Sequence, residues 1–224
     1  MSPFSNWLEN HITLQSYDNR KEELANAVTH LAGALLSLVG MVLLVKAGLD
    51  KGDNAMTAGF VVFTLSMLLL YSASGFYHLV KPSNLKRFLR ILDHSNIYFL
   101  IAGTYTPILI AVGTKLSYAF IAVVWGIAFL GVAFTLVFWG RLKPLHVVLY
   151  IAMGWLIVFI WGPVTAVIPA GLMKWIIAGG VTYTVGTGFY AMKKLPFYHA
   201  IWHVFVLGGS ICFFLGIYRY IPGL

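Results

Sequence analysis

The chain has 224 residues, of which 60% are hydrophobic and only 10% are charged, and its mean hydropathy is +0.85. A soluble domain of this size carries roughly a quarter of charged residues to cover its surface, so a water-soluble fold is excluded and lipid is the expected solvent. The net charge of +8 arises from basic residues in short loops rather than in one stripe, which argues against nucleic acid as a partner and predicts contacts with lipid headgroups.

The N-terminal segment, residues 1–22, precedes the first long apolar run. It lacks the basic start and the apolar core of a cleavable signal peptide, so we expect no removed leader. Its apolar residues share one face at helical spacing: Phe4, Trp7, Leu8 and Ile12. This pattern predicts an amphipathic helix lying along the membrane surface, with a frayed terminus as the alternative.

Seven apolar stretches follow, each long enough to cross roughly 30 Å of hydrocarbon as a helix. They are 25–46, 55–80, 91–112, 118–139, 145–162, 174–192 and 199–220. The fifth is interrupted by Gly162, Pro163 and, further on, Pro169. Continuous apolar character excludes the alternating runs of about ten residues that build a membrane barrel. The predicted fold is all-α, an integral membrane bundle of seven transmembrane helices in one domain, residues 23–224.

The Lys and Arg residues predict how this bundle is oriented. One side carries Arg20, Lys21, Lys81, Lys86, Arg87, Arg90, Arg141, Lys143, Lys193 and Lys194. The other side carries only Lys46, Lys51, Lys115, Lys174 and Arg219. Because basic residues accumulate on the cytoplasmic side, we expect the N-terminus and residues 1–22 to face the cytoplasm and the C-terminus to lie outside.

Ionisable residues inside the spans are functional candidates, because each costs about 2.5 to 3.5 kcal/mol at a helix centre. Here they are His30, His78, Asp93, His94, His146, His199 and His203. With the orientation above, every one of them lies toward the cytoplasmic side.

Three of these histidines have the spacing and depth of metal ligands. His199 and His203 are four residues apart, which places both imidazoles on one helix face, and His78 ends the second span at a similar depth. Three neutral imidazoles with an open position filled by water are the arrangement of catalytic zinc, which lowers the pKa of that water to about 7. A histidine pair alone more often has a packing role or lies at the membrane interface, so the prediction of a metal site depends on all three histidines. The single cysteine, Cys212, excludes a cysteine-rich metal site.

Two further polar residues lie at the same depth. Asp93 is the only acidic residue after Asp53, and it is predicted to act as a general base or to hold a ligand or the zinc water. Ser74 lies one turn deeper than His78 on the same face and is expected to orient water or substrate. For the remaining histidines we expect structural or interfacial hydrogen bonding: His11, His30, His94 and His146.

Four stretches together carry a family resemblance. They are EELANAVTHLAGALLS (22–37), SASGFYH (72–78), LDHSNIYFLIAGTYTP (92–107) and HAIWH (199–203). In this order and in these spans, the chain resembles the bacterial hemolysin III branch of the progestin and adiponectin receptor superfamily, which is itself similar to the alkaline ceramidases. The resemblance covers nearly the whole chain from about residue 22.

The resemblance implies a seven-helix bundle in the bacterial inner (plasma) membrane with Zn²⁺ near the cytoplasmic leaflet. The residues that match the zinc ligands of the family are His78, His199 and His203. Those that match the polar partners of its zinc water are Ser74 and Asp93. Those that match its first-span motif are Glu23, Asn26 and His30, for which the sequence predicts no role.

Three functions are compatible with this pattern. The first is a zinc-dependent hydrolase of lipid amides or esters reached from the bilayer, with a ceramide-like or other acyl lipid as substrate. The second is a sensor or regulator of membrane lipid state, in which zinc is structural and neither Ser74 nor Asp93 has a chemical task. The third, ranked last, is a cytolysin, which the family name suggests but the hydrophobicity and the lack of a secretion signal oppose.

The distribution of basic residues generates a prediction about topology. An alkaline phosphatase fused after Leu224 should be active in cells, because that enzyme works only outside the cytoplasm. A green fluorescent protein at the same position serves as the control and should stay dark when exported. Phosphatase that is inactive beside a bright fluorescent fusion would reverse the orientation.

Overall fold

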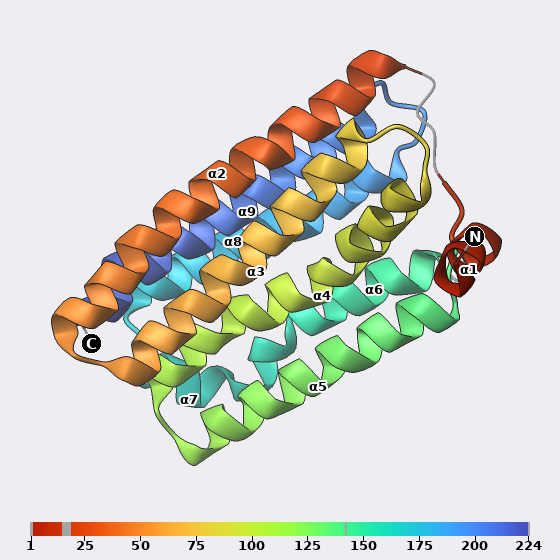
Figure 1. Cartoon of the computed structure of the whole chain (residues 1–224). Helices are drawn as coiled ribbons and strands as arrows, with labels where there is room; N and C mark the ends of the chain where they lie inside the picture. The colour runs from red at the N-terminus through yellow and green to blue at the C-terminus, as the bar shows by residue number, and fades with distance from the viewer. Residues whose placement is uncertain (1, 15–18, 142, 224) are drawn as a thin grey trace.

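The structure is a computed structural model that describes residues 2–14, 19–141 and 143–223, and its regular elements there are all helical (Figure 1). The elements are α1 (Pro3–His11), α2 (Arg20–Lys51), α3 (Asn54–Leu79), α4 (Asn84–Val112), α5 (Lys115–Val137), α6 (Lys143–Gly154), η1 (Leu156–Ile160), α7 (Trp161–Thr165), α8 (Ala170–Ala191), α9 (Tyr198–Tyr220) and η2 (Ile221–Gly223). The predicted all-α class is confirmed.

Among the described residues, six helical segments are long and apolar enough to cross a membrane. They are α2, α3, α4, α5, the segment Leu145–Thr165 and α9, and they coincide with six of the seven predicted spans. The remaining predicted span, 174–192, forms α8, which has 22 residues but is rich in glycine and threonine and is less apolar. The chain is therefore a helical membrane protein, and the count of seven spans stays a prediction.

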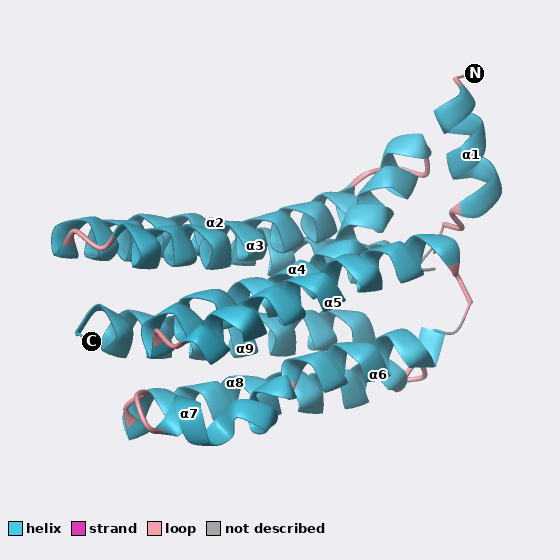
Figure 2. Ribbon diagram, turned by 90° about the horizontal axis from the view of Figure 1, so that it is seen from below, coloured by secondary structure: helices cyan, strands magenta, loops and turns pink. Residues whose placement is uncertain are grey.

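The long helices lie side by side in one bundle (Figures 1 and 2). α2 packs against both α3 and α9, α8 packs against α9, and α4 packs against α3 and α5. The start of α2 and the α3–α4 and α8–α9 connections lie together at one end of the bundle (Figure 1). This arrangement brings the end of α3 and the start of α9, from distant parts of the chain, to the same depth.

Short polar residues begin these helices, and glycines end two of them. The side chains of Asp53 and Ser83 accept hydrogen bonds from the backbone amides at the starts of α3 and α4, and Thr114 and Ser117 form a capping box at the start of α5. α4 ends at Gly113, whose φ of 67° is left-handed and therefore suits glycine. The loops are thus short, as expected from the polar breaks between the apolar stretches.

Glycine allows α2 and α3 to approach closely. A Cβ atom on Gly33 would lie 2.9 Å from Cγ of Tyr71, and one on Gly75 would lie 2.7 Å from Cδ2 of Leu31. Small residues permit such contacts between membrane helices, where close packing replaces the hydrophobic effect. The close approach fixes the last turns of α3, which carry His78, against α2.

The N-terminal segment contains the predicted helix. Leu8 and Ile12 are buried, the side chain of Asn84 donates to Glu9 at 2.9 Å, and Nε of Arg87 donates to the carbonyl oxygen of Ile12 at 3.2 Å. α1 therefore docks on the start of α4. Residues 1 and 15–18 of this segment lie outside the described residues, and its contact with a membrane surface stays a prediction.

The fifth predicted span is broken, but the break follows Gly154, whereas the predicted breakers Gly162 and Pro163 lie inside α7. α6 ends at Gly154, and a 3₁₀ helix and the short α7 follow it. The hydroxyl of Tyr105, on α4, donates to the carbonyl oxygen of Gly154 at 2.7 Å and accepts from the amide of Ile157 at 3.0 Å. Backbone groups freed within hydrocarbon must be satisfied by protein, and Tyr105 does this at the break.

We predict that Tyr105→Phe lowers the free energy of unfolding by about 1 to 3 kcal/mol, because it leaves a buried backbone group without its partner. The measurement is unfolding of purified protein in detergent. The control is Tyr118→Phe, which removes a hydroxyl from a side chain that is 49% exposed. Equal stability of the two variants would contradict this role of Tyr105.

Candidate metal centre

Three histidines from two helices form a compact cluster. His78 lies in the last turn of α3, and His199 and His203 lie in the first turns of α9. Nitrogen atoms of the three rings lie within 4.8 Å of one another. The ring centroids of His199 and His203 are 4.5 Å apart, and each is 5.3 Å from that of His78. The structure thus brings together the three residues predicted from spacing and depth.

Hydrogen bonds from α2 orient two of these rings. Nδ1 of His78 lies 2.6 Å from Oε2 of Glu23, and Nδ1 of His203 donates to the backbone carbonyl oxygen of Asn26 at 3.1 Å. Thr29 adds its hydroxyl at 3.3 Å from the same nitrogen of His203. With Nδ1 engaged in both rings, Nε2 is the nitrogen that each can offer to a metal, a pattern typical of histidine ligands.

The first-span motif thereby acquires a structural role that the sequence did not predict. Glu23 contacts His78, Asn26 contacts His203 through its carbonyl oxygen, and the ring of His30 stacks on that of His203 with centroids 3.5 Å apart. The structural or interfacial hydrogen bonding expected for His30 is thus replaced by ring stacking on a member of the cluster. The spacing of residues 23, 26 and 30 places them on one face of a helix, which was the available signal.

Asp93 and Ser74 lie near the cluster. The Asp93 carboxylate is 3.5 Å from Nδ1 of His94 and lines the same cavity as His199 and His203. Ser74 is completely buried one turn before His78. A carboxylate and a hydroxyl are therefore held next to the three imidazoles.

The other histidines make the structural contacts expected of them. Nδ1 of His11 bonds to the carbonyl oxygen of Trp7 at 2.9 Å, and Nδ1 of His94 bonds to that of Arg90 at 3.0 Å. His146 lies 3.5 Å from the Tyr98 hydroxyl. None of the three belongs to the histidine cluster among the described residues.

A basic residue missed by the sequence analysis also reaches the site. Lys86 was counted only as one of the loop charges that orient the bundle. It is 4% exposed, and its Nζ lies 3.3 Å from Oε1 of Glu23. Sequence spacing carries no signal for this contact, because the two residues lie on different helices.

Two residues of the cluster, His199 and His203, form part of the wall of a cavity of about 500 Å³. Its walls come mainly from α4, α6, α8 and α9, and they include Asp93, His199 and His203. The rest of the lining is largely apolar, with residues such as Leu100, Ile108, Ile157, Val206 and Phe213. The cavity is thus mostly apolar, and it carries polar side chains such as Asp93, His199 and His203 in its wall.

The donor set fits a transition metal. Three imidazoles suit zinc and other borderline metals, whereas magnesium and calcium prefer oxygen ligands. His78 and His203 are buried and their rings are already oriented, which lowers the cost of assembling a site. These residues could hold one ion, with the cavity on the side of His199 and His203.

Comparison with known proteins assigns the chain to a family. Residues 19–214 match the profile of a family described as Haemolysin-III related. The chain belongs to this family. The matched region of the Haemolysin-III related family contains all three histidines together with Ser74 and Asp93, and it excludes α1.

Relatives extend this assignment along most of the chain. The protein is 42% identical over 201 residues to the Hemolysin-3 homolog of Bacillus subtilis, covering 89% of this chain and 94% of the relative. It is 40% identical over 202 residues to Hemolysin-3 of Bacillus cereus, covering 90% and 92%. It is 26% identical over 207 residues to the human Monocyte to macrophage differentiation factor, covering 89% and 84%. The predicted hemolysin III resemblance is confirmed.

The geometry predicts that one zinc ion binds per chain through His78, His199 and His203. Replacing any one of them by Ala should sharply lower the zinc content of purified protein, whereas His11→Ala and His146→Ala should leave it unchanged. Chelation should also lower the unfolding temperature, because an ion that binds only the folded bundle stabilises it. Equal zinc content in the wild-type protein and in His203→Ala would contradict the assignment of these three histidines as the metal ligands.

Proposed function

We propose that this chain is a seven-span protein of the bacterial inner membrane that holds zinc and hydrolyses an amide or ester bond of a membrane lipid. The observation that carries the proposal is that two of the three clustered histidines, His199 and His203, line a mostly apolar cavity of about 500 Å³. A site for soluble substrates would not need apolar walls on this scale. A ceramide-like or other acyl lipid fits a mostly apolar cavity that has histidines and a carboxylate in its wall.

The proposal includes α8 as the seventh span. Its 22 residues extend about 33 Å at the helical rise of 1.5 Å per residue, which is enough to cross the hydrocarbon core. It packs along α9, and its modest hydropathy is compatible with a helix that faces a neighbour and a cavity as well as lipid.

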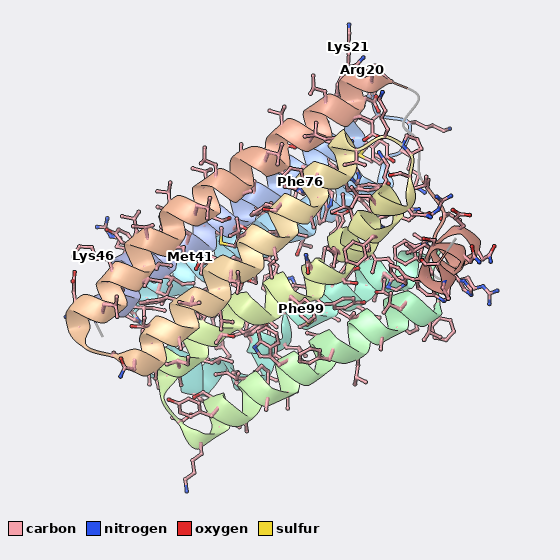
Figure 3. The ribbon with its side chains drawn as sticks, viewed as in Figure 1. Arg20, Lys21, Met41, Lys46, Phe76 and Phe99 are labelled. Atoms are coloured by element: carbon pink, nitrogen blue, oxygen red, sulfur yellow. The ribbon has the colours of Figure 1, made fainter. Side chains whose placement is uncertain are left out.

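The proposed orientation has the N-terminus in the cytoplasm. Figure 3 shows Arg20 and Lys21 at the start of α2 and Lys46 toward its other end. The end with Arg20 also carries the start of α4 and the α8–α9 connection, where further basic residues lie (Figure 1). The excess of basic residues at this end supports a cytoplasmic location for the histidine cluster.

A zinc ion bound by three histidines supplies a Lewis acid that polarises a carbonyl group and makes water a stronger nucleophile. His78, His199 and His203 would hold it. Proton transfer and binding of the acyl chain would depend on the side chains around the cluster.

Asp93 is positioned to manage the proton. Its carboxylate lines the cavity together with His199 and His203, so it can accept a proton from the attacking water and return it to the departing amine or alcohol. The Ser74 hydroxyl can orient that carboxylate by hydrogen bonding. The apolar lining, including Leu100 and Phe213, excludes bulk water and receives the acyl chain.

A lipid sensor is the second candidate function. It is favoured by one observation, namely that the three imidazoles come from α3 and α9, which both pack on α2. An ion there would fix the relative position of these helices, and a lipid in the adjoining cavity could change it. In that case neither Asp93 nor Ser74 takes part in bond cleavage.

We predict that Asp93→Asn separates these functions. For a hydrolase, the Asn variant keeps the shape of the side chain and loses the proton acceptor, so zinc should remain while lipid-amide cleavage falls by roughly 10²- to 10⁴-fold. Cleavage and zinc content are measured on the same purified samples, with His203→Ala as the metal-free control.

Three results would change the assignment. Undiminished cleavage by the zinc-loaded Asn variant would dismiss Asp93 as the base. A zinc affinity that is weaker by about 10- to 100-fold, with cleavage falling in proportion, would make Asp93 a residue that orients a ligand. No cleavage by the unchanged protein across ceramides and related acyl lipids would favour the sensor.

A further inference from the structure

A buried ammonium group lies near the histidine cluster. Lys86 occupies the first turn of α4, and only 4% of the residue is exposed. Lysine is almost never this buried unless a partner compensates its charge. Its Nζ lies 3.3 Å from Oε1 of Glu23 and 4.8 Å from the centroid of the Tyr77 ring, which supplies a cation–π contact.

The partner carboxylate has a second contact. Oε2 of Glu23 lies 2.6 Å from Nδ1 of His78, so the two oxygens of one carboxylate join an ammonium group on α4 to an imidazole on α3. Glu23 itself is on α2. Three helices therefore meet at this carboxylate, and its orientation decides how the His78 ring is held.

We propose that Lys86 is a positioning residue of the metal centre, which acts on His78 through Glu23. This inference rests on the metal site of the proposed function and is independent of whether a lipid is cleaved. Glu23 is still 17% exposed, so its side chain has a route to solvent when nothing holds it. The ammonium group holds Oε1 and thereby keeps Oε2 on His78.

The charge and the position of Lys86 have opposite effects on a metal cation. A positive charge near a dication repels it, so removing the charge alone would strengthen metal binding. Removing a group that orients a histidine ligand weakens metal binding by about 10- to 100-fold. The direction of the change in affinity therefore distinguishes the proposed role from a general electrostatic effect.

The experiment measures zinc affinity of the full-length protein in detergent by competition with a chromogenic chelator. Lys86→Met should bind zinc about 10- to 100-fold more weakly, and Lys86→Arg, which keeps a cation in place, should lie much closer to the unchanged protein. The matched control is Lys81→Met, which removes an exposed lysine from the connection just before α4 and should have no effect.

A double-mutant cycle tests the route through Glu23. In a Glu23→Ala background, Lys86→Met should cause no further loss of zinc affinity, because the carboxylate that transmits the effect is gone. Unfolding of the chelated proteins reports their folding separately from metal binding. If Lys86→Met does not fold, Lys86→Gln takes its place with the same expected direction.

Three outcomes would overturn the proposal. They are unchanged or stronger zinc binding by the Lys86 variants, an equal loss in the Glu23→Ala background, and absence of zinc binding by the unchanged protein. Failure to cleave lipids would remove the hydrolase assignment and leave this result intact, since no step of the measurement uses a lipid.

Discussion

Inside hydrocarbon, a polar side chain has no water to bond with, and its partners must come from the protein. This constraint explains why so many polar groups converge where α2, α3, α4 and α9 meet. The Glu23 carboxylate satisfies both Lys86 and His78, and the Asn26 carbonyl oxygen satisfies His203. The candidate site is therefore a cluster of mutually dependent contacts, in which each polar group can be buried only because the others satisfy its hydrogen bonds or charge.

Much of the fold could be predicted because a single physical requirement controls it. An apolar run long enough to cross lipid must be a helix, and the breaks between such runs coincide with capping residues such as Asp53 and Thr114. The pair His199 and His203 was predictable for a related reason, since a spacing of four fixes their relative direction on one helix. His78 could be added to this pair only because it lies at a similar depth in the membrane.

The depth of a residue in the membrane does not predict how its helix is rotated or which helices pack against it. The contacts that the sequence did not predict depend on this packing. His30 stacks on His203 because α2 packs on α9. Lys86 contacts Glu23 because the packing of α3 on both α2 and α4 brings the start of α4 close to the start of α2. No spacing within one segment encodes these contacts. The lower hydropathy of α8 reflects the same limit, because a helix that borders a cavity and another helix need not be apolar on every side.

The origin of the cluster in α3 and α9 has a consequence for how the protein is made. A ribosome delivers His78 long before His199 and His203, which lie on the last long helix of the described chain. The three imidazoles can meet only after α9 has been synthesised, inserted and packed against α2. Until then the Asn26 carbonyl oxygen and the His30 ring lack the contacts that His203 gives them in the complete bundle.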